Sequence, residues 1–446
     1  MEFIEEFDTA IGLWTDGKIV EAIHSRSAED VYEFAETLAL IAKHYFQPST
    51  KPNENFSFIA NSSLSGGNQP CSYAECRRKK LNELITFSAL YADEVYIQNP
   101  FENVMLGGVE NIKEVDRHEL VYGIGNYFHL KPLIEAGIIK YAQNEVSLCQ
   151  LHHETIAKPI AVRIAEKEEQ LYDAIHKILL HQSTVTFDIE KDAGPFLKIS
   201  GPDNLIEHGE MYFHFYKPLP PFITSLLDKE LPYTLSRQEI IDSGVLGVII
   251  NPILRDLSNQ EWHSVFYGTS YLCDNKTKMQ IASKLNSGAY AASSLVFENS
   301  MKHYLPAIYC QDMKTIMQLR KSEEEAFTVY RDKLRALIHQ SKPWDEKEVS
   351  SVFRDQLLPE INNIDKKVND WKSKTKESLK EKMIFGTGTV SMGLYAGMLP
   401  MNMGEIIAAI GGGSAAVGAL MDYNKTLKEK EEARSNDFYF LWQASQ

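Results

Sequence analysis

The sequence predicts a mixed α/β (α+β) protein in its first two-thirds, followed by a region of long helices. Three observations carry this prediction: helical and strand patterns alternate at first, long charged helical patterns follow, and a glycine-rich apolar stretch lies near the end. A chain of 446 residues is long enough for two or three domains. The changes in pattern place them at residues 1–155, 156–310 and 311–446.

The amino-terminal domain is expected to alternate helices with short strands. Residues 29–47 and 73–92 carry apolar side chains at helical spacing, and residues 95–97 favour a strand. A second strand is predicted at residues 138–139, after a helix that ends at a glycine. Residues 48–72 are rich in Pro, Asn, Ser and Gly, which is typical of an irregular surface loop.

The pattern in the middle of the chain predicts a second α/β unit, and the pattern that follows is typical of long helices. Residues 159–182 form an amphipathic pattern that begins with proline in its first turn. Residues 183–190 and 211–216 alternate as strands do. Residues 310–341 and 348–382 are long, charged and periodic, which predicts two long helices.

The apolar stretch at residues 383–421 is divided by Pro400 into two arms. Each arm is close to the lower limit for a membrane helix, which needs about 20 residues. Small residues recur at four-residue spacing, so two helical arms would pack closely as a hairpin. These residues are Gly393, Gly397, Ala408, Gly412 and Ala416.

Three interpretations of this hairpin are open. It can be the buried layer of a soluble helical bundle, which Glu405 favours because a charge inside a bilayer is costly. It can insert into a membrane from the cytosolic side, since lysines flank both ends. It can also be stored within the fold and released when a ligand or partner prefers the released form.

The charge and the cysteine content limit the cellular compartment and the binding partners that we expect. The formal charge of -15 disfavours broad binding to nucleic acid. The basic run from Arg77 to Lys80 is expected to be a solvated helix face. Five cysteines form no disulfide framework, and the opening residues lack the pattern of a signal peptide, so a cytoplasmic protein is expected, peripheral to or inserted in a membrane when triggered.

One group of residues has the chemistry of a metal site. Cysteine and histidine side chains suit tetrahedral zinc, and four of them fall in two short segments. The alternative is a set of reduced, partly buried thiols. The candidate ligands are Cys71, Cys76, Cys149 and His152.

No cofactor other than this zinc is expected, and no catalytic residue is assigned. The glycine-rich segments lack the spacing of nucleotide-binding loops, and the zinc-protease motif HExxH does not occur. The favoured function is therefore non-enzymatic: a sensor, effector or assembly protein, of the toxin-like or defence type, whose hairpin drives oligomerisation or membrane action. Its partner would be another protein or a second copy. The alternatives are a zinc-containing hydrolase or nuclease and a structural subunit of a larger complex.

Overall fold

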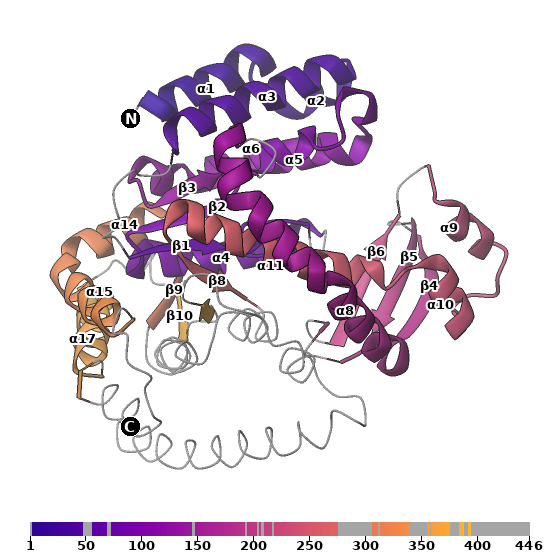
Figure 1. The fold of residues 1–446 in the computed structure, drawn as a ribbon. Helices are drawn as coiled ribbons and strands as arrows, with labels where there is room; N and C mark the ends of the chain where they lie inside the picture. The colour runs from indigo at the N-terminus through magenta and orange to yellow at the C-terminus, as the bar shows by residue number, and fades with distance from the viewer. Residues whose placement is uncertain are drawn as a thin grey trace. The chain divides into compact units, whose positions relative to one another are not determined.

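The computed structural model describes residues 2–47, 56–68, 73–144, 148–191, 194–202, 205–206, 209–215, 218–274, 306–310, 313–338, 355–356, 358–374, 383–387 and 391–393. These residues form two compact units (Figure 1). Unit 1 contains described residues from 2–164, 255–274 and 306–393, and unit 2 contains those from 165–254. Unit 1 thus joins segments that are far apart in the sequence. The three consecutive domains expected from the sequence stay a prediction.

Unit 1 is built around a sheet in which four neighbouring strands are parallel. The strand order is β11-β8-β1-β2-β3, and β11 pairs antiparallel with β8 at one edge. Most residues of β1, β2 and β3 are buried, as expected for parallel strands covered by helices on both faces. The strands are β1 (Ser57–Ala60), β2 (Glu94–Gln98), β3 (Ile139–Ala142), β8 (Ser270–Cys273) and β11 (Ser391–Gly393).

The amino-terminal helices of unit 1 form one packed layer. Figure 1 shows the first three helices, in indigo, side by side, and the second and third pack on α6 and α5 respectively. Aromatic rings fill their interior: Phe7 lies 4.5 Å from Tyr127 and 5.3 Å from Phe101, measured between ring centroids. The helices of this layer are α1 (Glu2–Thr15), α2 (Ile19–Ser25), α3 (Ala28–Tyr45), α5 (Pro100–Met105) and α6 (Glu114–Glu135).

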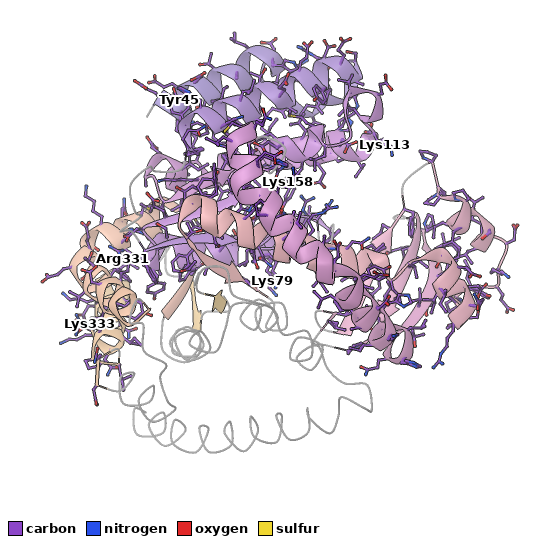
Figure 2. All side chains as sticks on the ribbon, in the orientation of Figure 1. Tyr45, Lys79, Lys113, Lys158, Arg331 and Lys333 are labelled. Atoms are coloured by element: carbon purple, nitrogen blue, oxygen red, sulfur yellow. The ribbon has the colours of Figure 1, made fainter. Side chains whose placement is uncertain are left out.

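A second group of helices in unit 1 packs around α4 (Ala74–Tyr91). Arg320 of α14 (Met313–Ser322) donates to the carbonyl oxygens of Ser88, Ala89 and Ala92, at 3.2, 3.2 and 2.7 Å. These carbonyls end α4 and would otherwise lack partners, because the last turn of a helix has no further amides to accept from. Figure 2 labels Arg331 and Lys333 on the next helix; Arg331 pairs with Asp93 at 3.2 Å, and Lys333 pairs with Glu360. The remaining elements of unit 1 are α15 (Glu324–Ile338), α17 (Leu358–Lys374), β9 (Pro306–Cys310), β10 (Met383–Thr387), α7 (Gln150–His152), η1 (Val109–Asn111) and η3 (His153–Ala157).

Unit 2 contains a four-stranded antiparallel sheet of order β6-β5-β4-β7. Val185, Phe187, Leu197, Ile199 and Met211 are buried and alternate with more exposed neighbours, so only one face of the sheet packs against a core. Its elements are β4 (Thr184–Glu190), β5 (Gly194–Ser200), β6 (Glu210–His214), α9 (Pro221–Leu226), β7 (Tyr233–Thr234) and α10 (Arg237–Ser243). The helix α8 (Lys158–Gln182) enters unit 2 at Ala165, and α11 (Gly247–Tyr267) leaves it after Leu254.

The mixed α/β class is confirmed, with a parallel four-stranded sheet, an antiparallel sheet and a predominance of helix. One expectation for the amino-terminal region is wrong: residues 48–72 are not only a surface loop. They contain β1, whose four residues are all buried in the middle of the parallel sheet. The first long helix is also interrupted, because α14 ends at Ser322 and α15 begins at Glu324.

The expected helical hairpin is wrong where its residues are described. Residues Met383–Thr387 form β10, which pairs antiparallel with β9, and Ser391–Gly393 form β11 beside β8. Gly386 and Gly393 lie within these strands, and glycine has low helix propensity, so strand pairing competes successfully with a helix here. Gly397, Ala408, Gly412 and Ala416 lie outside the described residues. Among the described helices, none has the length and apolar character needed to span a bilayer.

Candidate functional site

Each of the four parallel strands is followed at once by a buried polar residue. Asn61 follows β1, Asn99 follows β2, Gln143 follows β3 and Asp274 follows β8. The first three are 1%, 1% and 3% exposed, and the Asp274 side chain is 4% exposed. Because the strands are parallel, all four residues lie at the same edge of the sheet. We call this the carboxyl edge.

The order of the strands marks the centre of this edge. From β1 the chain moves to β2 and β3 on one side, and it returns later to β8 on the other side of β1. The direction of progression therefore reverses between β1 and β8. In open α/β sheets, ligands bind outside the carboxyl ends of the strands at such a reversal.

A hydrogen-bonded network joins the ends of β1 and β8. Asn61 Nδ2 donates to Asp274 Oδ1 at 2.9 Å, and Ser63 Oγ donates to Asp274 Oδ2 at 2.7 Å. The ammonium of Lys80, on α4, lies 3.1 Å from the same Oδ2. These partners stabilise the charge of a carboxylate that is almost removed from water. The network places hydroxyl, amide, ammonium and carboxylate groups together at the strand ends.

The loop after β1 is held in one conformation by its own glycines. A Cβ on Gly67 would lie 2.3 Å from Ser62 Oγ and 2.7 Å from the Ser62 carbonyl oxygen, so only glycine fits. Gly66 has a φ of +79° and accepts a hydrogen bond from Arg77 Nε at 2.9 Å. The loop therefore presents Asn61 and Ser63 on rigid backbone.

The basic run at the start of α4 supports this loop, so its interpretation as a solvated face is wrong in part. Arg77 is 7% exposed and binds both carboxylate oxygens of Glu119 at 2.7 Å. Its guanidinium lies 3.7 Å from the centroid of the Tyr122 ring. Lys80 pairs with Asp274 in the network at the ends of β1 and β8. Only Lys79 of the run is exposed.

The helix α11 carries a second set of buried polar side chains, of which Asp256 and His263 reach the carboxyl edge. Asp256, Gln260 and Ser264 recur at four-residue spacing, and His263 lies beside them, so the four share one face of the helix. They are 4%, 4%, 0% and 2% exposed in that order. Most buried helix faces are apolar, so a buried polar stripe of this length needs a reason.

Two hydrogen bonds fix this stripe against the strand ends. Asp256 Oδ1 accepts from the Ser62 amide, in the loop after β1, at 3.3 Å. His263 Nε2 lies 2.8 Å from the carbonyl oxygen of Gln143, which follows β3. The stripe thus reaches from the end of β1 to the end of β3.

His263 is a positioning residue in this arrangement. Burial lowers the pKa of His263 to about 4, although hydrogen bonds to the backbone of Gln143 and Asn259 oppose the shift. The imidazole is therefore neutral at pH 7. Since a carbonyl oxygen only accepts, Nε2 carries the proton and is already engaged with Gln143.

Several polar atoms around the stripe have no hydrogen-bond partner among the described residues. They are Gln143 Nε2, Gln260 Nε2, Ser264 Oγ and Thr269 Oγ1, and all four residues are at most 4% exposed. Thr269 directly precedes β8, so it lies at the amino end of that strand, where its amide donates to the Ser264 carbonyl oxygen at 3.1 Å. Leaving a buried polar group without a partner costs about 1–3 kcal/mol. Such atoms in a native protein indicate a bound water or ligand.

The end of β2 adds an acidic group to the edge. Asn99 caps α5 and donates to Glu102 Oε1 at 3.4 Å, and Glu102 also accepts from the Asn144 amide. Glu102 is 2% exposed. With Asp256 and Asp274, it gives the edge three buried carboxylates, against the ammonium of Lys80. The edge therefore suits a ligand that donates hydrogen bonds better than it suits an anion.

The residues predicted to bind zinc are only partly described. Cys76 lies on α4 and Cys149 precedes α7, and both are exposed. Cys71 and the side chain of His152 lie outside the described part of the chain. Zinc binding by these four residues stays a prediction. Within the described residues, no three metal-binding side chains of the carboxyl edge have ligand atoms within 4.8 Å of one another.

Comparisons with known protein families, with curated proteins and with solved structures found no significant match. The fold and the site define a class: a mixed α/β protein with a buried polar edge at the reversal of a parallel sheet. Reasoning from sequence missed this site because β1 was hidden in a loop-like segment. The available signal was a polar residue directly after each short apolar run, as at Asn99 and Gln143.

Proposed function

We propose that this protein is a ligand-responsive effector or assembly protein whose unit 1 binds a small polar molecule at the carboxyl edge. One observation carries the proposal: buried polar atoms without described partners lie along the polar stripe of α11, which is hydrogen-bonded to the chain after β1 and after β3. Structural polar networks are normally completed within the protein, whereas binding sites leave groups for the ligand.

The ligand class follows from the groups available. Gln143, Gln260 and Ser264 offer amide and hydroxyl groups, and the carboxylates of the carboxyl edge accept hydrogen bonds from hydroxyl or amino groups. In related geometry, an acidic side chain at a strand end binds the hydroxyls of a ribose. An uncharged ligand with several hydroxyl or amino groups, such as a nucleoside or a sugar, fits this set.

The response to the ligand is proposed from the sequence. The apolar segment from residue 383 onward contributes β10 and β11 to unit 1, and β11 lies directly beside β8, whose end carries Asp274. A ligand that binds this edge can therefore favour one state of the segment, provided that its affinity for the two states differs. The output would be self-association, binding of a partner protein or membrane action.

Ligand binding is tested with the full chain and a panel of nucleosides and monosaccharides. A binder present at 100 times its dissociation constant should stabilise the protein by about 2.7 kcal/mol and raise its melting temperature. Ser264→Ala and Gln260→Leu should weaken binding at least tenfold. Ser225→Ala, at an exposed serine of α9, is the matched control and should bind normally.

The response is tested with the same ligand by light scattering after size-exclusion chromatography and by liposome flotation. A ligand-dependent change in mass or flotation supports the effector role. If no panel member alters the melting temperature, or if Ser264→Ala binds as the wild type does, the proposal fails.

A further inference from the structure

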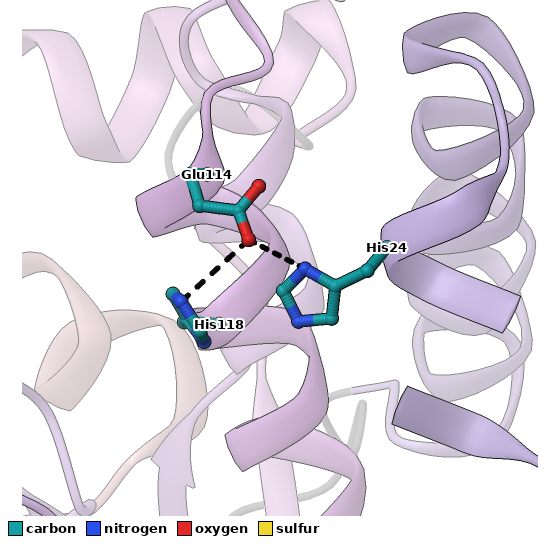
Figure 3. Close-up of side chains that lie close together, drawn as sticks. All are labelled: His24, Glu114 and His118. Carbon is teal, nitrogen blue, oxygen red and sulfur yellow. Dashed lines mark ion pairs between the residues drawn. The ribbon is translucent and has the colours of Figure 1, made fainter. Parts of the chain in front are cut away.

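A second polar cluster lies in the amino-terminal helical layer, away from the residues of the carboxyl edge. His24 Nδ1 lies 2.5 Å from Glu114 Oε1, and His118 Nε2 lies 3.7 Å from the same oxygen (Figure 3). One ligand atom from each of the three residues falls within 4.8 Å of the other two. Figure 3 shows the carboxylate of Glu114 between the two imidazole rings.

Two helices hold these side chains together. Glu114 and His118 are four residues apart in the first turns of α6, so they project from the same face. His24 belongs to the last turn of α2. Arg117 donates to the carbonyl oxygen of Ile23, which fixes the end of α2 against α6 immediately beside the cluster.

The donor set is that of a transition-metal site. Two imidazole nitrogens and one carboxylate oxygen are the protein ligands of a common class of zinc centre, in which water takes a fourth position. With metal-to-ligand distances of about 2.0–2.2 Å, tetrahedral ligands lie roughly 3.3–3.5 Å apart. The present separations of 2.5 and 3.7 Å lie on either side of that value, so rotation of exposed side chains can reach it.

We propose that His24, Glu114 and His118 bind one divalent ion of the zinc class and so link α2 to α6. His24 is 26% exposed, whereas Glu114 and His118 are 58% and 60% exposed. The ion therefore has a direct path from solvent and keeps at least one water. This inference is independent of the ligand proposed for the carboxyl edge, since the two sites share no residue.

Cobalt titration of the full-length protein tests the proposal, because Co²⁺ replaces Zn²⁺ and reports its ligands by visible absorption. We expect one equivalent to bind with a spectrum of nitrogen and oxygen ligands and to be displaced by Zn²⁺. The double variant His24→Ala/His118→Ala should lose more than the roughly 10- to 100-fold in affinity that removal of an outer-shell partner costs. His181→Ala, at an exposed histidine of α8, is the matched control and should bind like the wild type.

Glu114→Gln keeps the size of the side chain and guards against misfolding of the double variant. It should weaken binding while the circular dichroism spectrum stays that of the wild type. The proposal is overturned if the wild type binds no cobalt, or if both variants bind as well as the wild type. A spectrum with sulfur-to-cobalt charge transfer would also overturn it, because the ion would then lie at the predicted cysteine site.

Discussion

The parallel sheet of unit 1 and the antiparallel sheet of unit 2 differ in how far the polar side chains on and beside their strands are buried. In β4 and β5 the polar side chains alternate outward, and in β6 Tyr212 is 39% exposed. In unit 1 the strands are buried, and so are the residues that follow them. Polar side chains on the exposed face of the unit 2 sheet are hydrated, although Ser183 Oγ and His214 Nδ1 are buried without a described partner. The polar groups at the carboxyl edge are buried and need partners inside the protein.

The buried polar residues of unit 1 fall into two groups, one explained by the stability of the fold and one that needs a further function. Asn61, Ser63 and Asp274 satisfy one another, so they can be explained as structure alone. Gln260 and Ser264 have no such explanation among the described residues. A fold selected only for stability would replace them with apolar side chains. Variants of the two groups of residues therefore show whether Gln260 and Ser264 serve a ligand or the fold.

The largest expected effect is in the core of the parallel sheet. Phe58→Ala in β1 removes a fully buried ring and should lower the free energy of unfolding of unit 1 by about 3–5 kcal/mol. Tyr212→Ala in β6, at an exposed position, should cost less than about 1 kcal/mol. Hydrogen exchange of amides in each unit measures both effects separately. Equal costs at the two positions would contradict the contrast between the sheets.

The next effect is a dependence of stability on pH that comes from His263. Its pKa is about 4 in the folded protein and ordinarily 6.5, so the unfolded chain binds the proton more tightly. The stabilisation is fully present above pH 6.5 and is lost as the pH falls toward 4, by about 3 kcal/mol in all. In chemical unfolding between pH 4 and 7, the free energy of unfolding of His263→Gln should change less with pH than that of the wild type. An unchanged slope would mean that the folded protein protonates His263 readily.

A smaller effect is expected where α14 closes the end of α4. Arg320→Ala leaves three carbonyl oxygens without their donor and should cost about 2–3 kcal/mol. Lys321→Ala, at the exposed neighbouring position, should stay within about 0.5 kcal/mol of the wild type. Denaturant titration of both variants is the measurement. If Arg320→Ala leaves the free energy of unfolding unchanged, water replaces the guanidinium at no cost.

The smallest effect on stability is expected on the polar stripe of α11. Ser264→Ala removes a buried hydroxyl without a described partner, so the unfolding free energy should change by less than about 1 kcal/mol or rise. The same change should weaken ligand binding at least tenfold. A loss of 2 kcal/mol or more without ligand would identify the hydroxyl as part of the structural network.

Much of the fold could be predicted from periodicity. Long amphipathic segments such as α3 and α8, and the strands β2 and β4, follow their patterns closely. The strand β1 could not, because four residues between runs of Asn, Ser and Gly give too short a pattern. Its partners β2 and β8 lie far away in sequence and decide its conformation.

The candidate sites were harder to predict because they are assembled across long stretches of chain. Asn61 meets Asp274 only when β8 pairs with β1, and His24 meets His118 only when α2 packs on α6. Neither pair has a spacing that a linear motif records. The apolar segment misled for a related reason: its composition permits a helix, but β8 and β9 supply strand partners to its first residues.

The most direct test of the carboxyl edge is the experimental electron density there at high resolution, from full-length protein that has not been exposed to denaturant. We expect density for an organic molecule in contact with Gln260 Nε2 and Ser264 Oγ on α11 and with Gln143 after β3. If those atoms are instead satisfied by ordered waters alone, and added nucleosides or sugars produce no new density, the protein does not bind a small polar ligand there.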